Sequence, residues 1–161
     1  MLIAVLADTH IPRGNRQLPE RCAGLIARAD AVIHAGDFTA ENVLAELESR
    51  GVPVYAVHGN VDEPTLRERL PATLEVEIDR VRIAVVHDAG PRAGRLERLR
   101  ARFPNADGVI FGHTHLPEHA RAGRFQIFNP GSPTERRRAP SRAMGMLTVG
   151  GGWARFRHIR L

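Results

Sequence analysis

Asp8 and His10 are the first residues of this sequence whose types and spacing could support chemistry. They stand two positions apart, directly after an apolar run from Leu2 to Ala7. Such a run is typical of a strand buried on both faces of a sheet, and open α/β sheets bind ligands beyond the carboxyl ends of their strands. Leaving a buried polar group without a partner costs about 2–7 kcal/mol. The pair is therefore expected to face solvent, to satisfy its polar groups locally, or to bind a cation.

Four further apolar runs end in polar clusters, and together they favour the cation. These clusters contain Asp37, Asn60 with Asp62, His87, and His113 with His115. Without Asp62, the clusters offer two Asp, one Asn and four His as oxygen and nitrogen ligands without sulfur, a set that favours manganese, iron, nickel or zinc. Seven ligands are too many for one tetrahedral ion and suit two ions that share a bridging carboxylate. Paired ions of this kind stabilise the attacking and leaving oxygens of a phosphoryl displacement.

The elements that must position these residues can be read from the hydrophobic pattern. The first half predicts strands over residues 2–7, 31–35 and 52–57, alternating with helices over 19–28, 40–49 and 64–70. This alternation is typical of parallel strands with right-handed crossovers. Thr39 is the expected N-cap of the second helix. The second half predicts a hairpin, a helix and five more strands: 73–78 and 81–86, then the helix 91–103, then 108–111, 118–122, 125–128, 143–149 and 153–159. Asp79-Arg80 is a poor two-residue hairpin turn, which leaves the hairpin register open.

Composition limits the function classes. The 161 residues predict a single domain over 1–161, and no apolar stretch approaches the 18 residues of a membrane-spanning helix. The N-terminus lacks the features of a signal peptide, so a cytoplasmic protein is expected. The net charge of +5 comes entirely from arginine, because the chain has no lysine. The arginines are scattered without interleaved aromatic residues, which gives little support to a nucleic-acid groove. The single cysteine, Cys22, is expected to be a core thiol.

Five ordered motifs give the sequence a specific resemblance. The chain resembles the calcineurin-like metallophosphoesterases in the motifs Asp8-Thr9-His10, Gly36-Asp37, Gly59-Asn60, His87 and Gly112-His113-Thr114-His115. It resembles their compact prokaryotic phosphodiesterases most in its small size and in the stretches Gly59-Asn60-Val61-Asp62 and Asn129-Pro130-Gly131-Ser132. This resemblance implies an αββα sandwich of two mixed β-sheets flanked by helices. It also implies two divalent metal ions, with manganese expected first and nickel, iron, zinc or magnesium as alternatives. A homodimer is expected from the habit of the family.

The same resemblance assigns roles to individual residues. The first ion is expected to bind Asp8, His10 and His115, and the second Asn60, His87 and His113. Asp37 is expected to bridge the two ions, with a hydroxide as the second bridge and as the nucleophile. The amide nitrogen of Asn60 could also contact a phosphate oxygen, so Asn60, His113 and Asp37 form the expected catalytic set.

Other residues near the motifs have open assignments. Asp62 is expected either to orient a nearby group or to cap the next helix. His58 could contact a metal-ligand side chain without touching the ion itself. Asp88 could disfavour a dianionic monoester, position a ligand histidine, or face solvent. Val61 stands where many members of the family have a histidine, which leaves the general acid unassigned. His34 lies within a predicted strand and is expected to be a hydrogen-bonded core histidine.

These observations favour a two-metal phosphodiesterase that hydrolyses a small phosphoester. The enzymatic alternative is a phosphomonoesterase that acts on a small metabolite. A different class of function is a non-catalytic protein-interaction module, because the small scaffold subunit of retromer resembles the same compact fold. The presence of all seven ligands favours catalysis. Substrate identity should depend on the loops 12–16, 88–95 and 132–141.

Overall fold

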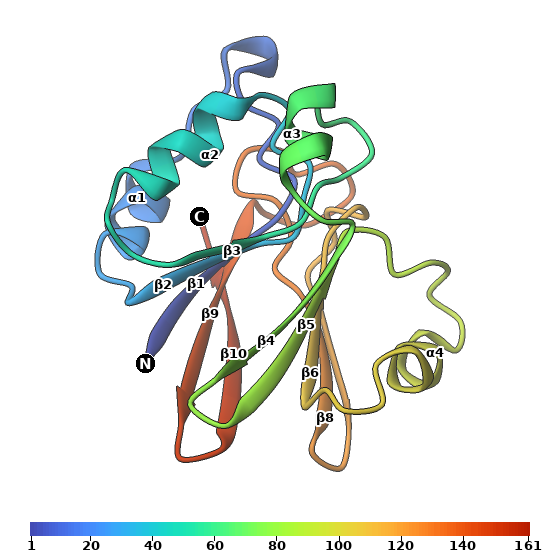
Figure 1. Ribbon diagram of the computed structural model, residues 1–161. Helices are drawn as coiled ribbons and strands as arrows, with labels where there is room; N and C mark the ends of the chain where they lie inside the picture. The colour runs from blue at the N-terminus through green and yellow to red at the C-terminus, as the bar shows by residue number, and fades with distance from the viewer.

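The computed structural model describes the whole chain, from Met1 to Leu161, as two five-stranded sheets packed face to face (Figure 1). The first sheet has the strand order β10-β9-β1-β2-β3, formed by Trp153–Arg160, Ala143–Gly150, Leu2–Leu6, Ala31–His34 and Val54–Ala56. The second sheet has the order β4-β5-β6-β8-β7, formed by Thr73–Ile78, Val81–Val86, Gly108–Phe111, Phe125–Asn129 and Glu118–Ala122.

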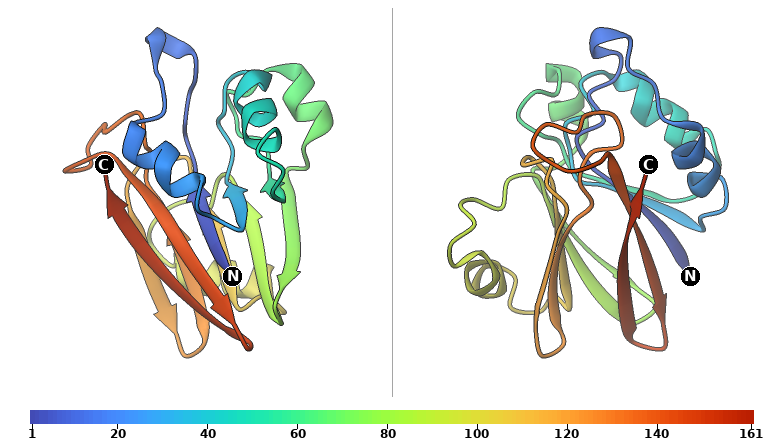
Figure 2. Two further views of the ribbon diagram at one scale, coloured as in Figure 1. Left: turned by 90° about the vertical axis from the view of Figure 1, so that its left-hand side faces the viewer. Right: turned by 180° about the vertical axis from the view of Figure 1, so that it is seen from behind.

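Helices cover the outer faces of both sheets, which confirms the predicted αββα sandwich. The first sheet is covered by α1 (Glu20–Ile26), α2 (Glu41–Glu48) and α3 (Pro64–Arg69), and the second by α4 (Arg95–Arg102). Figure 2 shows the same layers from the side and from behind. A short 3-10 turn, η1 (Arg13–Asn15), follows the first strand. No helix combines the length and the apolar character needed to cross a membrane.

Three apolar layers hold the sandwich together. The central layer lies between the sheets, where Ile33 of the first sheet and Ile83 and Phe128 of the second belong to one buried cluster. A second layer joins α1, α2 and α3 to the first sheet, and a third joins α4 to the second sheet through Leu99 and neighbouring residues. Each strand between two layers is apolar on both faces, which explains why these strands appear in the sequence as unbroken apolar runs.

The strand directions bring the polar clusters to one edge. In the first sheet β1, β2 and β3 are parallel neighbours, and in the second β5, β6 and β8 are parallel neighbours. The carboxyl ends of the strands in such a group lie at the same edge of the sheet. The loops that follow β1, β2, β3, β5 and β6 therefore meet at one end of the sandwich.

Two local expectations need correction. Thr39 is not the N-cap of α2: Ala40 occupies that position, and the backbone N–H of Glu41 donates to the carboxylate of Glu63 at 2.9 Å. Thr39 instead adopts a left-handed backbone with φ of 89°. The second correction is α4, which begins at Arg95 rather than near residue 91, because Gly94 before it has a left-handed backbone with φ of 64°.

The hairpin with the unfavourable turn sequence forms in a defined register. Ile78 pairs with Val81, so Asp79 and Arg80 make a two-residue turn with φ of 48° and 64°. The Asp79 carboxylate accepts a hydrogen bond from the N–H of Gly151 at 3.1 Å, and its carbonyl accepts one from Gly152 at 3.2 Å. A tertiary contact with the β9–β10 turn thus stabilises a turn that local preference disfavours.

Gly145 in β9 provides a test of how tightly the central layer is packed. A Cβ at this position would lie 2.5 Å from Cε1 of the buried Phe128 and 3.0 Å from Cβ of Val5. We expect Gly145→Ala to lower the free energy of unfolding by about 1–3 kcal/mol, since overpacking strains a dense core. Urea unfolding measures this value.

The matched control is Gly24→Ala in α1, where a Cβ would meet no atom within 4 Å. Alanine should stabilise this helix by about 0.5–1 kcal/mol. Equal stability of the Gly145 variant and the unsubstituted protein would contradict the packing described between the two sheets.

Candidate metal centre

The first group of predicted ligands converges after β1 and β6. The Nε2 atoms of His10 and His115 lie 3.2 Å apart. The Oδ1 atom of Asp8 lies 3.4 Å from Nε2 of His115 and 3.9 Å from Nε2 of His10. All three side chains are buried. Their ligand atoms therefore enclose one small space, as required of residues that share an ion.

The second group converges after β2, β3, β5 and β6. The Oδ1 atom of Asn60 lies 3.1 Å from Nε2 of His87 and 3.0 Å from Nδ1 of His113. The Oδ2 atom of Asp37 lies 3.3 Å from Nε2 of His87 and 3.8 Å from Nε2 of His10. Asp37 thus lies between the two groups, where the expected bridging role would place it. Asp8 can join either group, because it also clusters with Asp37 and His87.

The backbone is strained at most of these residues. Five of the seven have a left-handed conformation, with φ of 55° at Asp8, 47° at His10, 60° at Asp37, 68° at His113 and 60° at His115. Residues other than glycine in this region cost on the order of 1–3 kcal/mol each, and such strain clusters at functional sites. Left-handed residues turn the chain sharply, which lets a short loop direct its side chains back over the strand ends.

Glycines beside these residues allow the loops to approach closely. A Cβ on Gly59 would lie 2.0 Å from Oδ1 of Asp37, and a Cβ on Gly36 would lie 2.9 Å from Nδ1 of His87. A Cβ on Gly112 would lie 3.0 Å from Oδ2 of Asp8. The glycines of the three motifs are therefore required by the space that the ligand residues occupy.

Burial and neighbouring charges shift the pKa values of the two carboxyl groups in opposite directions. Burial raises the pKa of Asp8 to about 7. Burial also acts to raise the pKa of Asp37, but its hydrogen bond and charge interaction with His87 outweigh this effect and lower the pKa to about 2. Burial lowers the pKa of His115 to about 4 and also lowers the pKa of His10. These two imidazoles are therefore neutral near pH 7, the form in which an imidazole nitrogen can bind a cation.

The donor set fits divalent cations. Three buried atoms of the first group lack a hydrogen-bond partner: Oδ2 of Asp8, Nδ1 of His10 and Nδ1 of His115. Buried polar atoms are normally paired, so an unpaired carboxylate oxygen among neutral imidazoles indicates a missing positive partner. Carboxylate, amide and imidazole donors suit manganese, iron, nickel or zinc.

Asp62 organises the loops around this centre. Its Oδ2 atom accepts hydrogen bonds from the N–H groups of Gly59 at 2.7 Å and Asp37 at 3.1 Å, and its Oδ1 atom accepts one from Thr39 at 2.7 Å. The cap position of α3 belongs to Glu63. Of the two roles expected for Asp62, the structure therefore favours orientation of nearby groups over helix capping.

The other residues near the motifs make fewer contacts. The ring of His58 approaches only the carbonyl of Gly59, at 3.3 Å. Asp88 is exposed and accepts a hydrogen bond from the N–H of Gly90 at 2.7 Å. His34 is fully buried, and its ring nitrogens contact Thr9 Oγ1 at 3.1 Å and the N–H of Gly36 at 3.2 Å. The prediction of a hydrogen-bonded core histidine is confirmed.

The end of β8 and the loop after it contain supporting residues that were not assigned from the sequence. The hydroxyl of Ser132 donates to the carbonyl of Asp8 at 2.7 Å, and Asn129 donates to the carbonyl of Gly112 at 2.8 Å. Oε2 of Glu135 lies 3.5 Å from Nδ1 of His115. The Asn129-Pro130-Gly131-Ser132 motif signals a rigid loop, but nothing local indicates that Glu135 faces a histidine twenty residues earlier.

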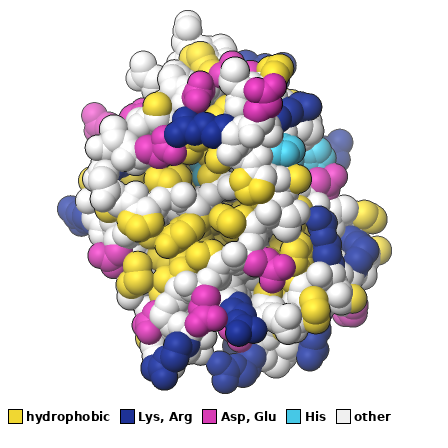
Figure 3. All heavy atoms as spheres, in the orientation of Figure 1, with side chains coloured by type: hydrophobic (Ala, Val, Ile, Leu, Met, Phe, Trp, Pro, Cys, Tyr) yellow, Lys and Arg dark blue, Asp and Glu magenta, His cyan; other side chains and the backbone are white.

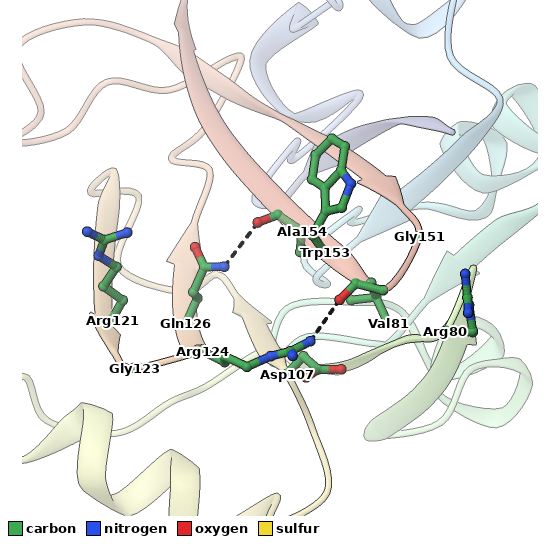
Figure 4. A pocket seen from close by; sticks show the side chains of 11 residues that line it. Arg80, Val81, Asp107, Arg121, Gly123, Arg124, Gln126, Gly151, Trp153 and Ala154 are labelled. Atoms are coloured by element: carbon green, nitrogen blue, oxygen red, sulfur yellow. Dashed lines mark hydrogen bonds between the residues drawn. The ribbon is translucent and has the colours of Figure 1, made fainter.

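A separate cavity lies at the other end of the sandwich. About 480 Å³ in volume, it is lined by Arg80, Arg121 and Arg124 near the β4–β5, β7–β8 and β9–β10 turns (Figure 4). It contains none of the predicted ligands. By contrast, histidine side chains reach the surface on the upper right of the face shown in Figure 3, toward the end where the strand loops meet. The chemistry therefore concentrates at one end of the molecule.

Comparison with known proteins agrees with this geometry. The family model described as the calcineurin-like phosphoesterase superfamily domain matches residues 1–152. A probable metallophosphoesterase of Methanothermobacter thermautotrophicus is 36% identical over 140 residues, which cover 83% of this chain and 78% of the relative. A phosphodiesterase of Methanocaldococcus jannaschii is 30% identical over 143 residues, which cover 81% of this chain and 83% of the relative. Vacuolar Protein Sorting 29 of Cryptosporidium parvum shares the fold, with a TM-score of 0.82 at 20% identity over 99% of this chain and 97% of that chain.

The three N–H groups bound by Asp62 predict a large effect of replacing its carboxylate. We expect Asp62→Asn to lower the free energy of unfolding by about 1.5–3 kcal/mol and the affinity for divalent ions by about 10–100-fold, because one acceptor oxygen becomes a donor facing N–H groups. Urea unfolding and calorimetric metal titration measure the two effects. Asp88→Asn, which alters an exposed carboxylate with one local contact, should change neither quantity. Wild-type metal affinity in the Asp62 variant would refute this role.

His34 predicts a defined pH dependence of stability in the metal-free protein. Burial lowers the pKa of His34 to about 3, below the value of 6.5 in the unfolded chain. The unfolded state therefore binds the proton first, and stability is lost as the pH falls below 6.5, by about 1.4 kcal/mol per pH unit.

In His34→Gln this contribution disappears. Between pH 6 and pH 4, the slope of the free energy of unfolding against pH should be about 1.4 kcal/mol per pH unit smaller in this variant than in the unsubstituted protein. Both proteins are unfolded with urea in the presence of a chelator. Parallel slopes in the two proteins would show that His34 does not remain neutral in the folded state.

Proposed function

The chain belongs to the calcineurin-like phosphoesterase superfamily, and from that premise we propose that it is a two-metal phosphodiesterase. The family and the clustered Asp and His residues imply a hydrolase of phosphoesters that depends on divalent metal ions. The observation that supports a two-metal enzyme is the pair of ligand groups joined by Asp8 and Asp37, in which every ligand position has a side chain able to bind a metal ion.

In this proposal each group of ligands holds one of the two metal ions. Asp8, His10 and His115 hold one ion, and Asn60, His87 and His113 hold the other, with Asp37 between them. The ions, with manganese expected first, would supply positive charge at the reacting phosphate and lower the pKa of bound water toward about 7. The hydrogen bonds of Asp62 and Ser132 keep the ligand loops in place without contact to the substrate.

Asn60 contributes a further donor. Its Oδ1 atom faces the imidazoles of His87 and His113, so its Nδ2 atom points away from them. Asn60 is also exposed, unlike Asp8 and Asp37. We assign its amide N–H to a phosphoryl oxygen of the substrate, where it would stabilise negative charge that develops during the reaction.

A diester is favoured over a monoester for two reasons. Val61, whose N–H donates to Oδ1 of Asp37 at 3.0 Å, is apolar and 37% exposed, and Asp88 presents a carboxylate to solvent after the ligand His87. Both features suit the single negative charge of a diester better than the dianion of a monoester. The relative from Methanocaldococcus jannaschii that is named a phosphodiesterase supports the same choice.

The second candidate is a non-catalytic interaction module. The likeness to Vacuolar Protein Sorting 29 carries information about the fold alone, at 20% identity. Five ligand residues have a strained backbone, and ligand residues also contain buried polar atoms without a hydrogen-bond partner. Both features favour catalysis, because a module that only binds proteins needs neither of them at its strand ends.

Hydrolysis by metal-stripped protein tests the proposal. We expect cleavage of bis(p-nitrophenyl) phosphate after re-supply of one metal at a time, with manganese most effective, and weaker cleavage of p-nitrophenyl phosphate. Asp37→Ala and His113→Ala should each lower kcat by at least about a hundredfold, since each removes charge stabilisation at the reacting phosphate. Release of p-nitrophenolate measures the rate.

Arg121→Gln, at the opposite end of the molecule, is the control and should retain full activity. Faster cleavage of the monoester than of the diester would replace the phosphodiesterase with a phosphatase. Binding of two ions without turnover of either ester would favour the interaction module.

A further inference from the structure

We infer that a pocket beside the metal centre binds one of the two alcohol groups of the diester, the one that stays on the phosphate. We infer also that this pocket selects an apolar group that carries its own negative charge. This inference rests on the proposed function. The pocket has a volume of about 310 Å³ and is lined by Arg92, Arg95, Thr114, Leu116, Pro117 and Glu118. The loop before α4 and the loop after β6 form its walls.

The wall nearest to the metal centre is part of the ligand loop itself. Thr114 stands between the ligand candidates His113 and His115, so its Cα atom is about 3.8 Å from that of each neighbour. Its hydroxyl contacts the Asn129 amide at 3.1 Å and the N–H of Leu116 at 3.3 Å, which fixes this wall. The pocket therefore shares a loop with two ligand candidates, which places it next to the metal centre.

The pocket carries one net positive charge. Arg95 is buried, forms an ion pair with Glu118, donates to the carbonyl of Gly90 at 2.6 Å and lies 4.9 Å from the ring centre of Phe111. The charges of Arg95 and Glu118 therefore cancel each other. Arg92 is exposed, and its guanidinium takes part in no ion pair or hydrogen bond of the structure. It remains free to bind a carboxylate or phosphate of the substrate.

The remaining lining is apolar. Leu116 is 39% exposed and, with Pro117, presents apolar surface to the pocket. A single exposed leucine is ordinary. Only four large hydrophobic side chains are exposed, however, and two of them, Val61 and Leu116, come directly after a ligand candidate. Covering such surface with an aromatic ring stabilises a complex by about 25 cal/mol per Å². An aryl or similarly apolar group with an anionic substituent matches both features.

Two substrates that differ in charge test the contribution of Arg92 to substrate binding. The probes are bis(p-nitrophenyl) phosphate and p-nitrophenyl 4-carboxyphenyl phosphate, which differ in that a carboxylate replaces the neutral nitro group on one arm. For the unsubstituted protein we expect a KM about two- to fivefold lower for the carboxylated ester, the range of a partly exposed ion pair. Arg92→Gln should remove this difference without changing kcat, and Arg92→Lys should retain part of it.

Arg121→Gln is the matched control, because it removes another exposed arginine, from the cavity at the far end of the sandwich. It should leave the KM difference intact. A similar loss in Arg92→Gln and Arg121→Gln would show only a long-range effect of net charge and would overturn the inference. Equal KM values for the two esters in the unsubstituted protein would overturn it as well.

Leu116→Ser tests the apolar part. It should raise KM for both aryl esters by about two- to fivefold, since an apolar contact is lost, and should leave KM for methyl p-nitrophenyl phosphate unchanged. Equal increases for the aryl and methyl esters would contradict an apolar contact with the second arm.

A binding measurement separates this inference from the proposed function. Calorimetric titration of the metal-loaded protein with 4-carboxyphenyl phosphate requires no turnover. Weaker binding to Arg92→Gln than to Arg121→Gln supports the pocket even in a protein that cleaves no ester, in which case only the proposed function fails. Equal binding to the two variants overturns the pocket whether or not the esters are cleaved.

Discussion

The arrangement depends on two carboxylates, Asp8 and Asp37, held among four imidazoles at the strand ends, where one oxygen of Asp8 has no hydrogen-bond donor. Burial raises the pKa of Asp8 to about 7, and its Oδ2 atom has no partner inside the protein. Such a cluster is unfavourable alone, because a buried carboxylate costs free energy unless a positive group is near. The rest of the fold must therefore hold these groups in place against that cost, and a divalent ion would offset it.

The fold holds them by converging strand ends and by carboxylates and hydroxyls that bind the backbone. Asp62 joins the loops after β2 and β3, while Ser132 and Asn129 join the loops after β1 and β6 to the end of β8 and the loop after it. None of these three side chains needs to touch an ion. Because they bind backbone rather than ligand side chains, they fix left-handed conformations that the local sequence would not adopt by itself.

The features that the sequence predicts well are those governed by short-range patterns. Unbroken apolar runs mark strands buried on both faces, and polar residues at their ends mark the site, so these patterns select all seven ligand candidates together with Asp62. The glycines of the motifs are predictable too, but their reason becomes clear only in three dimensions, where a Cβ on Gly59 would occupy the space of the Asp37 carboxylate.

What the sequence could not predict depends on contacts between distant segments. The cap of α2 comes from Glu63 rather than the adjacent Thr39, and the Asp79-Arg80 turn is stabilised by backbone N–H groups of a hairpin about seventy residues later. Glu135 faces His115 only because the loop after β8 folds back over the end of β6. In each case the local preference is weak, and a tertiary hydrogen bond or ion pair of about 0.5–3 kcal/mol decides the outcome.

The same division separates reaction chemistry from substrate choice. The candidate metal ligands lie on sheet-anchored loops whose positions are fixed by buried hydrogen bonds, so substitutions there are tolerated poorly. Arg92 and Leu116 lie on the rim, are exposed, and contribute nothing to the buried core. Substitutions there cost little stability, since surface changes away from packed features are usually within about 0.5 kcal/mol. A fold of this kind can therefore keep its reaction while its rim is adapted to a new alcohol group.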